Sequence, residues 1–285
     1  MRRDTYDLYT ADVRAVVGYI LNHLDEPLEP ACLARHAAFS TYHFHRIFRG
    51  LMGESISEFV KRMRLERAAC RLLSGSRVVE AALDAGYESH EAFTRAFREV
   101  YACAPSAFRE KHRNVVELPS PTGTHYRSDF SASALRPLRP DAEMEVAVRA
   151  EPARRTAALR HTGPYYQIGP RFAELICWLQ ERNAPFSECL AVWHDDPELT
   201  PIVELRSDAC AVVPPDFDIE NGPVRELVIP GGLFAVTTHI GPYSGLQGAW
   251  ERLCGKWLPA SGYRLSSQTS FEVYRNDCGV TPVQD

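Results

Sequence analysis

Hydrophobic residues recur at helical spacing through the first part of the chain, at positions i, i+3, i+4 and i+7. Residues 12–24 carry their apolar side chains on one side only, which predicts a helix packed on a core. The same spacing predicts helices over residues 28–37, 55–73 and 77–85, and Gly75 is placed to end the third of these four. The first part of the chain is therefore expected to be all-α.

One segment of this helical part occurs twice. Residues 89–109, SHEAFTRAFREVYACAPSAFR, match residues 40–60, STYHFHRIFRGLMGESISEFV, after a shift of 49 positions. Each copy begins with a serine that can cap a helix and carries an apolar stripe opposite a polar one. The apolar stripes are Phe44, Ile47, Phe48 and Leu51, and Phe93, Ala96, Phe97 and Val100; the polar ones are Tyr42, His45, Arg46 and Arg49, and Glu91, Thr94, Arg95 and Arg98. One copy is typical of an ordinary surface helix, whereas two copies indicate a repeated role.

A short helix and a tight turn precede each copy, so the pattern predicts two helix-turn-helix units. In such a unit the second helix enters the major groove of DNA. The helix over residues 55–73 is expected to connect the two units. Its basic residues, Lys61, Arg62, Arg64, Arg67 and Arg71, are expected to lie mostly outward on a solvated face.

The pattern changes after residue 117. Residues 118–140 are rich in Pro, Ser and Thr without periodicity and predict a linker, on which Tyr126 and Phe130 are placed to dock. Residues 141–285 contain a second repeat, with an offset of 78: HTGPY at 161–165 recurs as HIGPY at 239–243. Each copy reads as two strands, a Gly-Pro-Tyr turn, an amphipathic helix and further strands. We expect two α+β halves about a pseudo-twofold axis, with a cleft between them.

The net charge of −5 divides unevenly along the 285 residues. Residues 1–117 hold 17 Lys and Arg against 16 Asp and Glu, while the remainder holds 15 against 21. A near-neutral first part still suits DNA if its arginines gather on one face. No apolar run approaches the ~20 residues that cross a bilayer, and the N-terminus lacks a signal-peptide core, so a cytoplasmic location is expected.

The eight cysteines form no CxxC pair, which argues against a zinc site or a disulfide framework. They are expected to be reduced thiols, and no cofactor is expected. His43 and His45 stand two apart on a helix and do not face a common metal ion, so no metal site is expected either.

The first part of the chain resembles the DNA-binding domain of AraC/XylS transcription regulators over about residues 10–113. The likeness rests on LARHAAFSTYHFHRIFRGLMGESISEFVKRMRLERAA and AALDAGYESHEAFTRAFREVYACAPSAFR; Ala102 departs from it, where the family has Gly. The resemblance implies that both recognition helices enter successive major-groove segments. It implies base contacts from Tyr42, His45, Arg46, His90, Glu91, Thr94 and Arg95, and phosphate contacts from Arg49 and Arg98. Arginine suits guanine, Glu91 suits the cytosine amino group, and Thr94 suits the thymine methyl.

The second part resembles the GyrI-like small-molecule-binding domain over about residues 143–276. The likeness rests on both GPY turns, DDPELTP, LRSDACAVV and FEVY. It implies a cleft for cationic or amphipathic compounds, with Glu272 as the carboxylate and Tyr165, Trp193 and Tyr243 as aromatic walls. Strand alternation places Glu272 opposite Phe271 and Val273, and we expect it level with Tyr274 only through a bulge. Trp178, Trp250 and Trp257 are expected to be core residues.

Together these features predict a multidomain chain: an all-α double helix-turn-helix domain over residues 1–117, the linker 118–140, and an α+β duplicated domain over 141–285. The favoured function is a transcription regulator in the Rob-like domain order, with double-stranded DNA, a small-molecule effector and RNA polymerase as partners. One alternative is a hydrolase using His161, His239 and Cys177 or Cys189; another is a protein-interaction module. The repeat-equivalent positions of the two histidines favour a structural role and a protein that is not an enzyme. Operator, ligand, oligomeric state and direction of regulation stay open.

Overall fold

A computed structural model describes residues 5–275, apart from 38–40, 115, 128–134, 139–143, 198, 220–221, 267 and 269. The chain divides into two compact units. The first contains residues 1–142 and 250–264, and the second contains residues 143–249 and 265–285.

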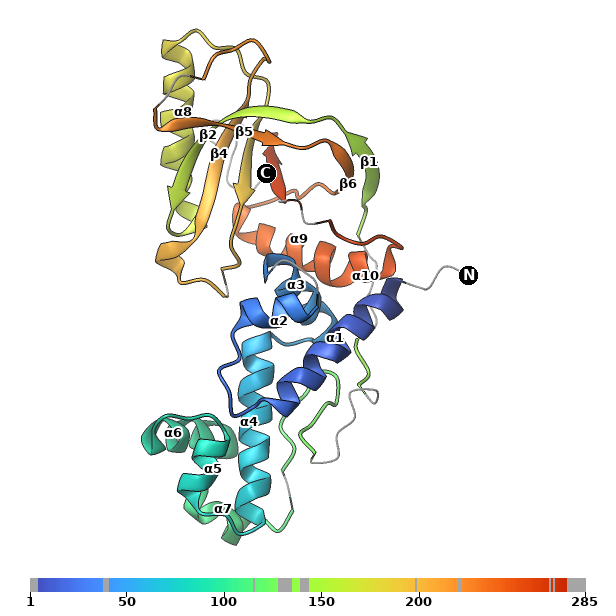
Figure 1. Ribbon diagram of the computed structural model, residues 1–285, viewed down its shortest axis with the longest axis vertical. Helices are drawn as coiled ribbons and strands as arrows, with labels where there is room; N and C mark the ends of the chain where they lie inside the picture. Colours follow the sequence, from blue (N-terminus) through green and yellow to red (C-terminus); the bar gives the residue numbers. More distant parts are fainter. Residues whose placement is uncertain are drawn as a thin grey trace. The chain divides into compact units, whose positions relative to one another are not determined.

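The first unit is helical, as the apolar spacing predicts (Figure 1). Its long helix α4 carries a group of helices at either end. The helices are α1 (Thr5–Asn22), α2 (Pro30–His36), α3 (Thr41–Met52), α4 (Ile56–Leu73), α5 (Val78–Asp84), α6 (His90–Tyr101) and α7 (Pro105–Lys111). The prediction of an all-α part with two helix-turn-helix units, α2–α3 and α5–α6, is confirmed.

The repeat of 49 residues reappears as a repeated aromatic core. Phe48 makes edge contacts with Phe44 and Phe59, with ring centroids 5.9 and 5.7 Å apart. At the equivalent positions Phe97 contacts Phe93 and Phe108, at 5.4 and 5.2 Å. All six rings are fully buried. The apolar stripes of α3 and α6 therefore fix both helices in the same way.

The ends of these helices follow local capping rules. The Ser89 hydroxyl accepts a hydrogen bond from the amide of Ala92 at 3.1 Å, as an N-cap does. Its counterpart Ser40 lies outside the described residues. After each recognition helix the chain turns through the left-handed region, at Gly53 (φ 74°) and at Ala102 (φ 53°). Ala102 thus holds a conformation that glycine adopts more easily.

The basic face of α4 is only partly solvated, and the outward placement predicted for Arg62 is wrong. Arg62 is 7% exposed, and its guanidinium donates to Glu54 Oε2 at 3.0 Å and to the carbonyl of Thr124 at 2.6 Å. Glu66, one turn further along α4, accepts from the amide of Tyr126 at 2.7 Å. This stretch of the predicted linker therefore lies against α4, drawn there by buried charges that need partners. Phe130 lies outside the described residues.

Residues 250–264 also belong to the first unit, which differs from the predicted division at residue 141. They comprise the end of α9 (Leu246–Glu251), a π-helical stretch Arg252–Trp257 and α10 (Leu258–Ala260). The amide of Gly262 donates to Thr5 Oγ1, and Arg264 pairs with Asp12, both at 2.7 Å. Sequence repeats predict a helix here but not its packing partner, which is α1 and α3.

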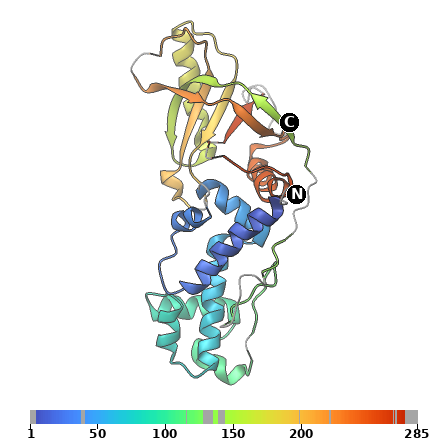
Figure 2. The same cartoon turned by 45° about the vertical axis from the view of Figure 1, so that its right-hand side comes forward.

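The second unit is an antiparallel α+β structure, and the predicted fold class is confirmed. A five-stranded sheet has the order β5-β2-β4-β3-β7, and β1 pairs with β6 in a separate two-stranded sheet. Helix α8 (Gly169–Glu181) covers one face of the larger sheet, where Leu175 and Leu179 meet Ala157 and Ala211 (Figure 2). The strands are β1 (Ala147–Glu151), β2 (Arg154–Thr162), β3 (Cys189–Trp193), β4 (Arg206–Val212), β5 (Val224–Ile229), β6 (Gly232–Val236) and β7 (Phe271–Tyr274).

The two sequence repeats of this unit exchange strands. Strand β1 of the first copy pairs with β6 of the second, and β5 of the second pairs with β2 of the first. The registers are equivalent: a shift of 78 positions converts the pair Ala147–Val236 into Arg225–Ala158, which the structure also contains. The pairing thus carries the expected pseudo-twofold relation.

Candidate functional site

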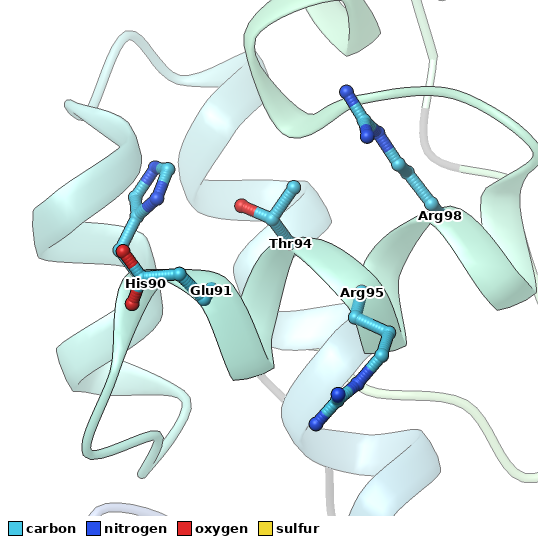
Figure 3. A pocket seen from close by; sticks show the side chains of 5 residues that line it. All are labelled: His90, Glu91, Thr94, Arg95 and Arg98. Carbon is cyan, nitrogen blue, oxygen red and sulfur yellow. The ribbon is translucent and has the colours of Figure 1, made fainter.

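Helix α6 presents a polar face away from the aromatic core. Phe93 and Phe97 are fully buried, whereas His90, Glu91, Arg95 and Arg98 are exposed and Thr94 is half-buried. These five polar side chains line one shallow surface pocket (Figure 3). All five are residues to which the sequence assigned DNA contacts, so the structure brings the second predicted reading set together on one surface.

The chemistry of this face suits the edges of base pairs. No ion pair to Arg95 or Arg98 is present among the described residues, so both guanidiniums are available for bidentate hydrogen bonds. The carboxylate of Glu91 offers acceptors, and Thr94 offers a methyl group while its hydroxyl oxygen is buried. Donor, acceptor and apolar groups therefore share one helix face.

Helix α3 does not present its predicted reading set in the same way. His45 is 2% exposed and Arg46 is 9% exposed, while Arg49 is half-buried. Tyr42 lies in α3, but its side chain is outside the described part of the structure. Burial also lowers the pKa of the neighbouring His43 to about 4, helped by the positive charge of Arg46. The first reading set is therefore largely covered in this state.

The four residues assigned to a ligand gather on one face of the larger sheet. Glu272 on β7 stands opposite Ala191 on β3, and Trp193 lies two residues further along β3 on the same face. Tyr165 packs on Trp193 with ring centroids 4.5 Å apart. Tyr243 reaches the same region through Tyr274, at 5.6 Å. The structure thus connects all four through β3 and β7.

Glu272 lies among aromatic rings without a bulge in its strand. The hydroxyl of Tyr274 donates to Glu272 Oε2 at 3.4 Å, and Phe172 of α8 meets the Tyr274 ring at 5.4 Å. The expectation that Glu272 needs a bulge to be level with Tyr274 is wrong, because residues two apart in a regular strand share a face. A half-buried carboxylate beside several aromatic faces is a suitable arrangement for a cation.

A charged cluster around Asp208 of β4 is not predicted from the sequence. Asp208 is fully buried and accepts from Arg160, His194 and Arg225, each at 2.7 Å. Burial raises its pKa, but the hydrogen bonds from His194 and Arg160 and the two arginine charges outweigh burial and bring the pKa to about 2. The cluster ties β2, β4 and β5 together. Its members are scattered in sequence, and only strand register reveals their proximity.

Four residues are candidate catalytic groups of a hydrolase: His161, His239, Cys177 and Cys189. The two histidines have structural roles. His161 Nε2 lies 3.0 Å from the carbonyl oxygen of Pro164, and His239 Nε2 lies 3.1 Å from that of Pro242. Each histidine thus closes its own Gly-Pro-Tyr turn in the same manner. Cys177 is exposed on α8, and Cys189 is half-buried on β3.

The described residues contain neither a candidate metal centre nor a candidate membrane span. Among them, no group of three or more His, Cys, Asp or Glu side chains is arranged to hold a metal ion. Within the same residues, no helix is both long and apolar enough to cross a membrane.

Fold and sites define a class: a helix-turn-helix DNA-binding regulator joined to a small-molecule-binding domain. Family comparison agrees, because residues 33–111 match a helix-turn-helix domain and residues 144–285 match the GyrI-like small molecule binding domain. The chain belongs to the GyrI-like family and carries an AraC-type helix-turn-helix domain in its helical part.

Individual relatives cover either part. The chain is 37% identical over 129 residues to DNA gyrase inhibitor 2 of Dickeya dadantii, covering 44% of this chain and 82% of that protein. It is 36% identical over 102 residues to the uncharacterized HTH-type transcriptional regulator YbfP of Bacillus subtilis, covering 35% of each chain. It is also similar to the DNA-binding domain of AdpA, solved with a target DNA, at 30% identity and a TM-score of 0.34 over 35% of this chain and 92% of that one.

Proposed function

We propose that this protein is a transcription regulator that reads the major groove with the outer face of α6. Thr94 and Arg95 read bases, His90 and Glu91 add contacts at the start of the helix, and Arg98 binds a phosphate. The observation that carries the proposal is the division of α6: its inner face is locked into the aromatic core while its polar face is turned to solvent. Tyr42, His45, Arg46 and Arg49 of α3 form the corresponding set for a second groove segment.

The proposal is tested by selecting duplexes from a random pool with the full chain and comparing two arginine variants. Arg95→Ala is expected to lower discrimination between selected and random duplexes by roughly 10- to 100-fold, about 1–3 kcal/mol, because a bidentate base contact is lost. Arg98→Ala is the matched control, one turn along the same face, and is expected to weaken binding to both duplexes alike. Equal losses on both duplexes with Arg95→Ala contradict the base-reading role.

We further propose that the second unit binds a lipophilic cation between its aromatic rings, with Glu272 as the counter-charge. Support comes from the carboxylate of Glu272 beside Tyr274 and from the adjoining pair Tyr165 and Trp193. Crystal violet, a cationic aromatic dye, is expected to raise the melting temperature of the full chain, since a ligand that binds only the native state stabilises it.

A pair of carboxylate variants separates this site from general charge attraction. Glu272→Gln is expected to abolish the dye-induced shift, whereas Glu226→Gln, which removes a carboxylate paired with Arg155 on another strand, is expected to leave it unchanged. An unaltered shift in Glu272→Gln removes Glu272 from the proposal.

We also propose that the protein is not an enzyme, because His161 and His239 both serve their own turns. Turnover of an activated ester such as p-nitrophenyl acetate is expected to stay at the background rate. Hydrolysis above background that is lost in both His161→Ala and Cys189→Ala would contradict this. Contact with RNA polymerase stays a prediction.

A further inference from the structure

The two recognition helices have equivalent inner faces and different outer faces. His45 and Arg46 of α3 are 2% and 9% exposed, whereas their equivalents in α6 are the half-buried Thr94 and the exposed Arg95. The cores beneath are alike, with the same aromatic contacts. The difference must therefore come from something that lies on the outer face of α3.

That outer face is covered by residues 250–260, which we call the covering segment (Figures 1 and 2). The contact is made backbone to backbone through two glycines. A Cβ atom placed on Gly50 would lie only 2.2 Å from Cα of Gly255, and one placed on Gly255 would lie 2.8 Å from the carbonyl oxygen of Arg46. No side chain fits between the helices here, so a DNA backbone or base edge cannot enter either.

The covering segment also engages Arg46, the principal guanine-reading candidate of α3. The Arg46 guanidinium lies over the Trp250 ring, 5.2 Å from its centroid. Its side chain also hydrogen-bonds to Cys254, and burial raises the pKa of that thiol to about 11 against the opposing influence of Arg46. The guanidinium that would pair with a base is thus occupied by an aromatic ring and a sulfur atom of the same chain.

The covering segment is the second-repeat counterpart of α8. In the first repeat, Leu175 and Leu179 of α8 are fully buried against the sheet of the second unit. Their counterparts Leu253 and Trp257 belong to the first unit instead. The stretch Arg252–Trp257 is π-helical, a wide helical form that is rare in proteins and frequent at functional sites. One copy of the repeated helix has therefore changed its packing partner.

We propose that the covering segment is an autoinhibitory clamp on α3, so that the chain in this state reads DNA with α6 alone. Two-helix reading requires release of the segment, because DNA and the segment compete for one face of α3. The inference rests on the proposed function. It also gives the ligand a route of action, since the segment continues directly from α9 and from the turn that holds Tyr243. A ligand that binds the two states unequally shifts their populations.

A glycine variant tests the clamp in the full chain. Gly255→Leu places a side chain where the helices touch and is expected to displace the segment, while Lys256→Leu adds the same side chain at the neighbouring exposed position and serves as control. Duplexes are selected from a random pool with each protein. The wild type and the control are expected to select one short motif, and Gly255→Leu two motifs spaced by about one helical turn, ~10 base pairs, with at least tenfold tighter binding. An identical two-part motif from all three proteins overturns the inference.

Thiol reactivity in the wild-type chain gives a second readout that does not depend on folding of a variant. Cys254 is 3% exposed and is expected to react slowly with iodoacetamide, as followed by peptide mass spectrometry. On a duplex carrying both motifs the wild-type labelling is expected to stay slow, because the chain in this state reads with α6 alone and α3 stays covered. Labelling that is fast in the free chain, or that accelerates at least tenfold on that duplex, overturns the clamp while leaving DNA reading intact. If no protein selects any motif, the proposed function itself fails, and the clamp with it.

Discussion

Helices α3 and α6 share a repeated sequence pattern, but their polar faces differ in exposure. The polar face of α6 is accessible to DNA, and that of α3 is covered. Their apolar stripes form matching phenylalanine cores, yet one polar face meets solvent and the other meets a helix from later in the chain. Local sequence therefore determines how a recognition helix is held. Whether that helix can be used is determined by what else the chain places upon it.

The largest expected effect tests the equality of the two cores. Phe44→Ala and Phe93→Ala each remove a fully buried ring and are expected to cost about 3–5 kcal/mol of unfolding free energy. Urea denaturation of the full chain measures both losses. Similar cavities carry similar costs. Losses of unfolding free energy that differ by more than about 2 kcal/mol would therefore show that the two helix-turn-helix units are packed differently.

The next effect is confined to α3 and depends on pH. The pKa of His43 is lowered from 6.5 to about 4, so the unfolded chain binds this proton first as the pH falls. Its contribution to stability is complete above pH 6.5 and is lost progressively toward pH 4, to a total of about 3 kcal/mol. The α6 counterpart is Ala92, which cannot titrate. His43→Gln is expected to make the urea midpoint less dependent on pH over this range. If the pH dependence is unchanged in this variant, groups other than His43 cause it.

A smaller effect separates an open reading helix from a covered one. In the wild-type chain Arg46→Ala is expected to change specific DNA binding less than threefold, because the guanidinium is already engaged. In the Gly255→Leu background the same substitution is expected to lower binding roughly 10- to 100-fold, as a base contact is then lost. Fluorescence anisotropy with a selected duplex measures both. If Arg46→Ala lowers DNA affinity equally in the wild type and in Gly255→Leu, the covering segment does not limit the use of α3, and α3 and α6 do not differ in availability.

The smallest effect concerns the turn after each recognition helix. Ala102→Gly is expected to stabilise the chain by roughly 0.5–1 kcal/mol, because glycine relieves the left-handed backbone at some entropic cost. The reverse change in the other copy, Gly53→Ala, is expected to destabilise it, since the new Cβ would lie 2.5 Å from Cβ of Pro121. Thermal unfolding of both variants checks the opposite signs.

Much of the fold follows from periodicity. Apolar spacing locates α2, α4 and α5 within two residues at either end, because a one-sided stripe has few ways to be buried, whereas α1 begins at Thr5, seven residues before the predicted start. The Ser89 cap and the shared role of His161 and His239 follow from local chemistry and from repetition. The reading set of α6 is also visible in sequence, since its polar residues recur on one side of the helix.

What the sequence does not reveal depends on distant contacts. Arg62 is indistinguishable from its solvated neighbours until Glu54 and Thr124 are placed beside it. The Asp208 cluster likewise depends on strand register, and the cover on Arg46 depends on a helix that lies some 200 positions later. Periodicity reports which face of an element is apolar. It does not report which polar face another element will occupy.

The exchanged strands of the second unit bear on how its two sequence copies came to be joined in one chain. Since β1 pairs with β6 and β2 pairs with β5 of the other copy, a half-length chain of the first copy would leave β1 without a partner and one edge of β2 open. Such a chain would be complete only as a symmetric homodimer, with two identical helices in identical surroundings. Fusion of the two halves into one polypeptide removes that constraint of symmetry. One helix could then keep its ancestral place on the sheet while its twin acquired a different partner.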